Sequence, residues 1–468
     1  MLALLLPFWI TTVYMASLAP QRATTLKEAF RICDVAPLAG EDLKRYYVPL
    51  DELRKSEAVE FVSAQLEFQD QGQFQCILFT GHRGSGKSTE LKRLQQQWHQ
   101  EFEVIYLEVD DETDLNDARY TDIYLIIIKH LGLRMKTLGL QFEPQLLANF
   151  EDWFKEITNE TEDTVAKSVN AEAEASLGAE APFLAKLIFK LQAQIKGSRT
   201  QKRKIRDTLQ KEVSRLKSDA NALLQDAMNK LQRLKPNSKG FLVIFDNLDR
   251  VPPEVGDHLF FDYSSQLREL RCTTLFTVPI SVLCSPRNVS NAFEQPNLVS
   301  MPNVYKLNRD KVNLDFNEEA VAKLATLLES RIDIDAVFDD REQTLELVRH
   351  SGGHVRQLFQ MARLALQKAY TQKKEKVTAD EVTYGFKQLQ FAFERAAREN
   401  HYGVMAQVCV DKDITKDDVG QLLLFSTAVL EYNGDDRWNY PNQAVLASQA
   451  FQEVLNDVRS KTQQSVDG

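Results

Sequence analysis

The chain has 468 residues, which is long for a single hydrophobic core and predicts roughly three domains. Its 43% hydrophobic and 26% charged residues are typical of a globular protein with a water-facing surface. The net charge of −10 excludes a protein whose whole surface attracts nucleic acid, and five scattered cysteines without a CxxC pair exclude a zinc knuckle or a disulfide scaffold and suit a reducing compartment.

The first 19 residues, MLALLLPFWITTVYMASLA, are mostly apolar and end in small residues. They read as an over-extended start with Met15 opening the chain, as a short membrane anchor with Arg22, Lys27 and Arg31 on the cytoplasmic side, or as an export signal. The run is shorter than the about 20 apolar residues that a membrane span needs. We therefore treat residues 1–23 as an apolar leader or mis-assigned start and expect a cytoplasmic protein, with membrane anchoring as the alternative.

Residues 24–75 predict a helical lead-in, because AVEFVSAQLEF spaces its apolar residues at helical intervals. The phrase CILFTGHRGSGKSTELKRLQQQW then joins an apolar strand, a glycine loop and a helix. A second strand is predicted at 102–110. The apolar run 122–135 fits a helix or a strand by period alone, and we predict a helix because adjacent parallel strands need a crossover.

Residues 141–238 differ from their surroundings in charge. The segment is acidic up to residue 180 and basic over 183–217, where eleven Lys and Arg face two acidic residues. We predict a long helical insert. It reads either as solvated helices whose oppositely charged faces attract, or as a basic arm for nucleic acid or anionic lipid.

The alternating pattern resumes after the insert. We predict strands at 240–246, 273–280 and 304–307, with a helix over 254–270. Residues 317–395 are strongly helical, and the last 70 residues place two short strand-like runs about an Asn433-Gly434 turn between helices. The expected domains are a lead-in (24–75), a core (76–310) containing the insert (141–238), a helical lid (311–395) and a winged-helix-like module (396–468).

The glycine loop matches GxxxxGK[ST] without a gap and lies between a strand and a helix, which is the context that supports a phosphate site. Glycines let successive amides point at phosphate oxygens, and the following helix adds its positive N-terminus. Lys87 would contact the β- and γ-phosphates, and the Ser88 hydroxyl would bind Mg²⁺. The expected ATP ligands are Gly81, His82, Arg83, Gly84, Ser85, Gly86, Lys87, Ser88 and Thr89.

The strand FLVIFDNLD supplies a carboxylate to the same edge of the sheet. Asp246 ends this strand, and a parallel sheet would bring it beside the bound Mg²⁺. The distance along the chain from Lys87 to Asp246 exceeds what two strands and two helices require. An insertion between them is therefore needed, and the charged segment 141–238 fills that place.

With these motifs, residues 45–395 resemble the additional-strand P-loop ATPases, in particular the AAA+ and STAND groups and the KAP-type and origin-recognition-like members with a D-x-x-D sequence. The resemblance implies a five-stranded parallel sheet followed by a helical lid. It assigns Lys87 and Ser88 to Walker A and Asp246 to Walker B. Within SGGHVRQLFQ, Arg356 resembles the sensor-2 arginine, and Thr277 is our choice for sensor 1.

The chain departs from the AAA+ pattern directly after the Walker B aspartate. A glutamate usually stands there as the base that polarises water, and Asn247 cannot accept a proton. Asp249 is either the substitute base or a structural carboxylate, at a helix N-terminus or in a salt bridge, for example with Arg250. Turnover is therefore expected to be slow. Arg287 and Arg309 are candidates for an arginine finger, although arginines at helix ends are common.

Three functions remain open from the sequence. The first is a STAND-like switch ATPase in which ATP and Mg²⁺ couple to lid movement and self-association with a second copy or a regulatory partner. The second is a DNA-associated ATPase that uses the basic insert or the C-terminal hairpin with Arg437, Trp438 and Tyr440. The third is a nucleotide-binding scaffold without turnover. A membrane contact is expected only through residues 1–19.

Overall fold

The structure is a computed structural model that describes residues 21–158, 176–178, 180–196 and 199–466. The predicted apolar leader, residues 1–19, lies outside the described residues, as does much of the acidic half of the insert. None of the helices in the described ranges is long and apolar enough to cross a membrane.

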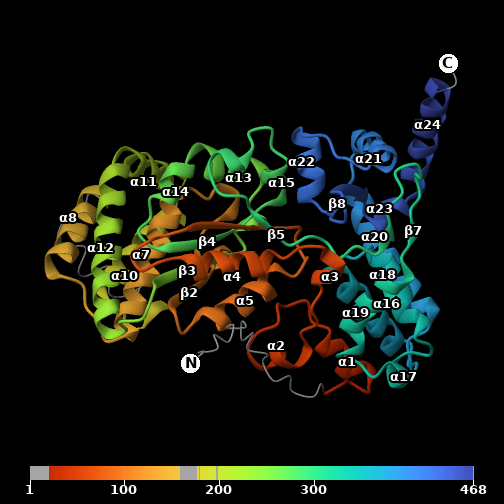
Figure 1. The fold of residues 1–468 in the computed structure, drawn as a ribbon, viewed down its shortest axis with the longest axis horizontal. Helices are drawn as coiled ribbons and strands as arrows, with labels where there is room; N and C mark the ends of the chain where they lie inside the picture. The colour runs from red at the N-terminus through yellow and green to blue at the C-terminus, as the bar shows by residue number, and fades with distance from the viewer. Residues whose placement is uncertain (1–20, 159–175, 179, 197–198, 467–468) are drawn as a thin grey trace, which may run out of the picture.

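A five-stranded parallel sheet forms the centre of the molecule, with strand order β2-β3-β4-β1-β5 (Figure 1). The order places β4 between the strand that precedes the glycine loop and the strand that ends in Asp246. The predicted parallel sheet is confirmed. Its strands are β1 (Cys76–Thr80), β2 (Phe102–Glu108), β3 (Gly240–Asp246), β4 (Thr273–Val278) and β5 (Asn297–Leu298).

The predicted last strand at 304–307 was wrong as a member of this sheet. The fifth strand of the sheet is β5, which pairs with β1 through only two residues. A strand this short shows no alternation of apolar and polar residues from which the sequence could predict it. Tyr305–Lys306 (β6) instead pairs antiparallel with Asp315–Phe316 (β7) in a separate ribbon.

Helices cover both faces of the sheet, because neighbouring residues of a strand point to opposite sides. Ile77 and Phe79 of β1 share a core with α4 (Ala58–Phe68) and α5 (Lys87–Trp98). Leu78 belongs to the core on the other face, which contains α7 (Tyr120–Thr137). The helix predicted at 122–135 is thus confirmed, whereas the one predicted at 254–270 is divided into α13 (Pro253–Asp257), a short π-helix (His258–Asp262) and α14 (Ser264–Arg268).

The insert lies at one end of the molecule as helices packed on α7 (Figure 1). They bury Trp153, Phe154 and Leu187 in the core that they share with the sheet. Arg206 is 3% exposed and pairs with Asp117 at 2.7 Å and Asp122 at 3.0 Å, so part of the basic charge is neutralised by the core. The helices are α8 (Pro144–Thr158), α10 (Phe183–Lys196), α11 (Arg199–Lys211) and α12 (Val213–Leu234).

The N-terminal segment packs with the lid at the other end, where α1 lies against α19 (Figure 1). The N-terminal helices are α1 (Leu26–Ile32), α2 (Gly40–Tyr46) and α3 (Asp51–Arg54). The lid helices are α16 (Glu318–Glu329), α17 (Ile334–Val337), α18 (Glu342–Ser351), α19 (Val355–Thr371) and α20 (Ala379–Ala396).

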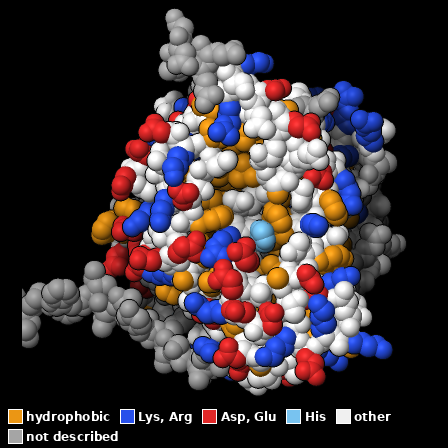
Figure 2. Space-filling model, turned by 90° about the vertical axis from the view of Figure 1, so that its right-hand side faces the viewer, with side chains coloured by type: hydrophobic (Ala, Val, Ile, Leu, Met, Phe, Trp, Pro, Cys, Tyr) orange, Lys and Arg blue, Asp and Glu red, His pale blue; other side chains and the backbone are white. Residues whose placement is uncertain are grey.

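The two strands of the C-terminal hairpin are buried, whereas residues 434–437 at its turn are exposed. Tyr432, Trp438 and Tyr440 are at most 2% exposed and surround Tyr305. Figure 2 views this end, where hydrophobic side chains gather in a strip between charged ones. The module contains α21 (Glu399–Asp411), α22 (Asp418–Phe425), β8 (Val429–Tyr432), β9 (Trp438–Pro441), α23 (Gln443–Leu446) and α24 (Gln449–Val466).

Candidate nucleotide-binding site

The glycine loop connects the end of β1 to the start of α5. Gly81, Gly84 and Gly86 have φ values of 146°, 84° and 104°, a region that disfavours other residues. A Cβ atom on Gly81 would lie 2.4 Å from the carbonyl oxygen of Val299. The loop therefore needs these glycines, and it ends at the N-terminus of a 12-residue helix, where anions are favoured.

The Lys87 ammonium is held by the protein itself. Its Nζ donates to the carbonyl oxygens of Gly81 (2.7 Å) and His82 (2.8 Å) and pairs with Asp249 at 2.8 Å. Lys87 is 4% exposed and Asp249 7%. A buried charge of this kind needs a partner, and the phosphates of a nucleotide would replace the carboxylate.

Ser88 and Asp246 meet at the carboxyl edge of the sheet. The Ser88 hydroxyl donates to Asp246 Oδ1 at 3.1 Å, and the Tyr106 hydroxyl donates to Oδ2 at 2.6 Å. Burial and the Asp246 carboxylate raise the pKa of Tyr106, so this phenol stays protonated and remains a donor. A hydroxyl and a carboxylate side by side form a donor set that fits Mg²⁺.

The residues after Asp246 turn sharply. Asn247 adopts a φ of 67°, and its Nδ2 donates to Asp110 Oδ1 at 2.8 Å. Arg250 pairs with the same Asp110 at 2.5 Å, whereas Asp249 forms its ion pair with Lys87 and not with Arg250, the partner given as an example for the salt-bridge alternative. The sequence analysis did not identify Asp110, although its place at the carboxyl end of the strand predicted at 102–110 was a signal.

Thr277 supports this turn from the neighbouring strand. Its hydroxyl donates to the carbonyl oxygen of Phe245 at 3.0 Å and accepts from the amide of Asp249 at 3.2 Å. The side chain is fully buried. The geometry therefore fits a residue that positions Asp249 better than one that touches a phosphate.

The lid reaches the loop through the N-terminus of α19. The amide of Arg356 donates to the carbonyl oxygen of Gly84 at 3.2 Å. A Cβ atom on Gly84 would lie 2.5 Å from His354 and 2.6 Å from Arg356, so only glycine allows this approach. Burial, Arg250 and Arg83 lower the pKa of Arg356, and an anion at this place would offset that cost.

The C-terminal module touches the loop as well. His82 is 1% exposed, and its Nε2 accepts from the amide of Glu431 in β8 at 2.7 Å. Burial, together with His354 and Lys87, lowers the pKa of His82 to about 3, so the imidazole is neutral and can accept. Arg83, the next loop residue, lies over the ring of Phe425 in α22.

A third contact comes from the N-terminal segment. Arg54 is 3% exposed and donates to the carbonyl oxygen of Ser85 at 2.6 Å and to Glu90 at 2.9 Å. The amide of Leu38 donates to the Thr89 hydroxyl at 3.2 Å. The segment predicted only as a helical lead-in thus holds both the loop and the start of α5.

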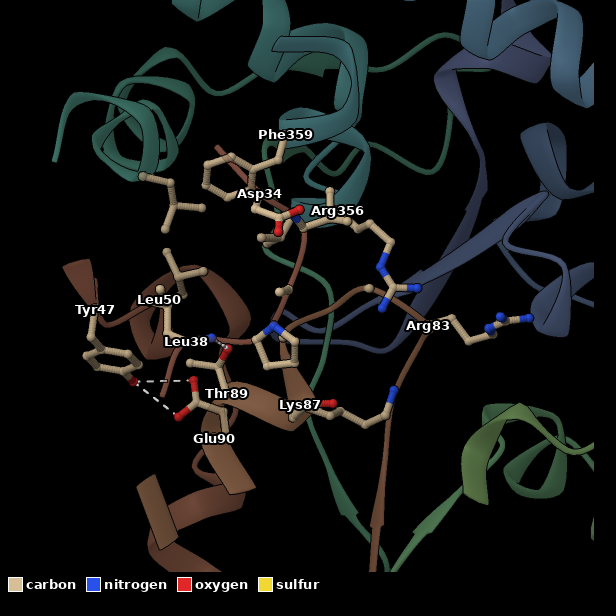
Figure 3. A pocket seen from close by; sticks show the side chains of 18 of the residues that line it. Asp34, Leu38, Tyr47, Leu50, Arg83, Lys87, Thr89, Glu90, Arg356 and Phe359 are labelled. Carbon is tan, nitrogen blue, oxygen red and sulfur yellow. Dashed lines mark hydrogen bonds between the residues drawn. The ribbon is translucent and has the colours of Figure 1, made fainter. Parts of the chain in front are cut away.

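The same segment forms one wall of a pocket beside the loop. In Figure 3, Lys87, Arg356 and Arg83 lie toward one end of this pocket, whereas Leu38, Leu50 and Phe359 lie toward the other. A cationic end beside an apolar end suits a nucleotide with its phosphates and its base. The sequence analysis did not predict this apolar end, and the further apolar lining of the pocket includes Val35, Val48 and Leu327.

The structure brings the predicted loop residues, Asp246, Asp249 and Thr277 together, and it places Arg356 beside them. The arginine-finger candidates do not line the pocket: Arg287 pairs with Asp262 at 2.7 Å, and Arg309 lies 3.8 Å from Asp413. The described residues hold no cluster of three or more His, Cys, Asp or Glu that fits a metal ion.

Comparisons with known proteins agree with this geometry. Residues 67–261, less than half of the chain, match the KAP family P-loop domain. The expected class, a P-loop NTPase of the additional-strand group to which AAA+ ATPases belong, is confirmed by this match and by the strand order. A comparison with curated proteins found no match.

Solved structures with similar chains include Drosophila ORC bound to DNA, with 11% identity, 96% of each chain covered and a TM-score of 0.39. The Aeropyrum pernix ORC2 protein in ADPNP–ADP complexes has 11% identity, with 92% of this chain and 98% of that chain covered and a TM-score of 0.38. A Walker-type ATPase of Pyrococcus abyssi has 13% identity, with 91% and 99% covered and a TM-score of 0.39.

Proposed function

We propose that the protein is an AAA+/STAND-like switch ATPase that binds ATP with Mg²⁺, hydrolyses it slowly and couples its nucleotide state to the lid and the C-terminal module. One observation carries this proposal: loop residues 82–85 hydrogen-bond to three distant segments. Gly84 accepts from α19, Ser85 from Arg54, and His82 from β8. A loop that moves when phosphate binds would pull on all three.

Phosphate binding begins with a change of partner for Lys87. The β- and γ-phosphates would take the ammonium that Asp249 now holds, which frees the Asp249 carboxylate. Ser88 and Asp246 would hold Mg²⁺, which supplies charge neutralisation when bound. The freed Asp249, positioned by Thr277, is then the candidate to accept a proton from water, since Asn247 cannot.

In this proposal, the loop carbonyl groups and His82 transmit the nucleotide state to the lid and the C-terminal module. A change in the loop backbone alters the Gly84 contact with the lid and the His82 contact with β8 together. Sub-ångström shifts at such packed contacts are converted into discrete rearrangements, because packed interfaces do not deform continuously. Self-association is the proposed output, and the apolar strip at the lid end in Figure 2 is a surface suited to a protein partner.

The test compares hydrogen exchange with and without Mg-ATP in wild type and in His82→Ala. We expect ATP to change the protection of 429–441 and of the N-terminal turn of α19 in wild type. In His82→Ala the change at 429–441 should be lost while the one at α19 remains, because only the acceptor for Glu431 has gone. His99→Ala, an exposed histidine at the end of α5, is the control.

Unchanged exchange at 429–441 on adding ATP to wild type would contradict the coupling to the C-terminal module. Light scattering with and without ATP tests the self-association, and an unchanged molar mass would remove it from the proposal.

A DNA-associated ATPase is the second candidate, and the exposure of Arg203 in α11 (85% of its side chain) favours it. The hairpin gives it less support, because Asp435 and Asp436 lie beside the turn and Arg437 pairs with Glu431 and Asp413. DNA binding that weakens steeply with salt would support this candidate. If the Lys87→Ala protein kept full activity, only the third candidate function, a nucleotide-binding scaffold without turnover, would remain. A cytoplasmic location stays part of the main proposal.

A further inference from the structure

An arginine lies at the apolar end of the pocket, away from the loop. Arg331 follows α16, is 5% exposed and lines the pocket with Leu327 and Phe359. Its guanidinium carbon lies 4.3 Å from the centre of the Phe359 ring. Arg331 thus places a positive charge beside apolar side chains, in a pocket whose lining also includes Asp34, Tyr47 and Glu90.

This guanidinium has few partners of its own. Its Nη1 lies 3.5 Å from the carbonyl oxygen of Ile32, and its Nε is buried without a hydrogen-bond partner. Among the residues that the structure describes, no carboxylate forms an ion pair with it, and Asp42 acts on it only as a more distant charge. Burial lowers its pKa. Donors buried in this way cost free energy until an acceptor reaches them.

A neighbouring arginine with similar contacts shows the difference. Arg363 stacks at 4.1 Å on Phe30 and donates to the Phe30 carbonyl oxygen at 3.0 Å. It also has a carboxylate partner, Asp34, at 3.4 Å, and 27% of its side chain is exposed. Arg363 does not line the pocket. Of these two stacked arginines, the one that faces the pocket lacks the carboxylate partner.

We propose that Arg331 recognises the base of the bound nucleotide by donating a hydrogen bond to a purine ring nitrogen. A guanidinium has only donors, so it selects an edge of the base that presents an acceptor. The apolar residues around it, with Phe359, would hold the faces of the ring. This proposal rests on the proposed function and adds a residue that distinguishes a nucleotide from its bare phosphate chain.

The test measures binding of ATP and of inorganic tripolyphosphate, each with Mg²⁺, to wild type, Arg331→Met and Arg363→Met. Methionine keeps an unbranched apolar side chain against Phe359 and removes the donors. We expect Arg331→Met to bind ATP about 10-fold more weakly, because a hydrogen bond is lost. Tripolyphosphate binding should stay within about twofold of wild type, and Arg363→Met should bind both ligands as wild type does.

Deaza analogues of ATP identify the acceptor. One of 1-deaza-, 3-deaza- or 7-deaza-ATP should bind wild type about 10-fold more weakly than ATP does. That analogue and ATP should bind Arg331→Met with equal affinity, because the variant has already lost the hydrogen bond that the analogue lacks.

Equal ATP binding by wild type and Arg331→Met would overturn the base-recognition role and leave the proposed function standing. Equal weakening of ATP and tripolyphosphate would also overturn it, because the substitution would then have disturbed the whole site. Failure of wild type to bind ATP at all would overturn both proposals.

Discussion

The two ends of the pocket are built in different ways. The phosphate end is one continuous stretch, from the end of β1 through the glycine loop into α5. Asp246 at the end of β3 and the nearby Asp249 complete it. The base end is assembled from the N-terminal segment, the lid helix α16 and the lid helix α19. Phosphate recognition is therefore local, whereas base recognition depends on how the lid sits on the core.

In the switch that we propose, this difference would let the lid respond to the bound nucleotide. A base bound between the N-terminal segment and the lid would bridge the two, while the phosphates bind the loop that the lid also touches through Gly84. The free energy of binding then includes the free energy of docking the lid. Substitutions at the phosphate end should change chemistry and affinity for every phosphate ligand, and those at the base end should change only nucleotide binding.

The largest effect is expected from Asp246→Asn. The substitution removes the carboxylate that accepts from Ser88 and Tyr106 and that would hold Mg²⁺. We expect turnover of ATP to fall by roughly 100-fold or more, about 3 kcal/mol of transition-state stabilisation. A steady-state phosphate-release assay measures it. Unchanged turnover would show that the Mg²⁺ site lies elsewhere. It would also contradict the claim that substitutions at the phosphate end change the chemistry.

A smaller effect is expected from Asp249→Asn. The carboxylate holds Lys87 in the free protein, so its loss raises the free energy of the free form relative to the nucleotide complex. ATP should bind roughly fivefold more tightly, about 1 kcal/mol, while turnover falls because the candidate base is gone. Calorimetric titration and the phosphate-release assay measure the two effects.

The asparagine in Asp249→Asn keeps the size of the side chain, so a loss of both binding and thermal stability would indicate a structural role and would contradict this account. Unchanged turnover with tighter binding would support the ion pair of Asp249 with Lys87 in the free protein and would exclude Asp249 as the catalytic base. The matched change at the base end is Arg331→Met, whose effect should be confined to ligands that carry a base.

The sequence predicted the strand, the glycine loop and the helix around Lys87, because these elements lie in consecutive residues. The spacing from Gly81 to Ser88 sets the loop, and the buried strand before Asp246 sets its partner. The long separation between them also predicted the insert, which the structure shows as α8 and α10–α12. Each of these motifs can be recognised because the residues that form it are consecutive in the sequence.

The rest could not be predicted for the opposite reason. His82 and Glu431 are 349 residues apart, and nothing in either local pattern indicates that they meet. The strand β5 is two residues long, and Leu38 and Leu50 lie in a segment whose helical spacing says nothing about a pocket. Arg331 resembles any arginine after a helix until its burial and missing carboxylate are seen.

Isothermal titration of wild type and Lys87→Ala with ATP in the presence of Mg²⁺ tests the central claim most directly. The account predicts a heat of binding with one ATP per chain for wild type and at least about 10-fold weaker binding for Lys87→Ala, because the buried ammonium contacts the phosphates. The absence of any heat with wild type, or equal affinity in the two proteins, would contradict it.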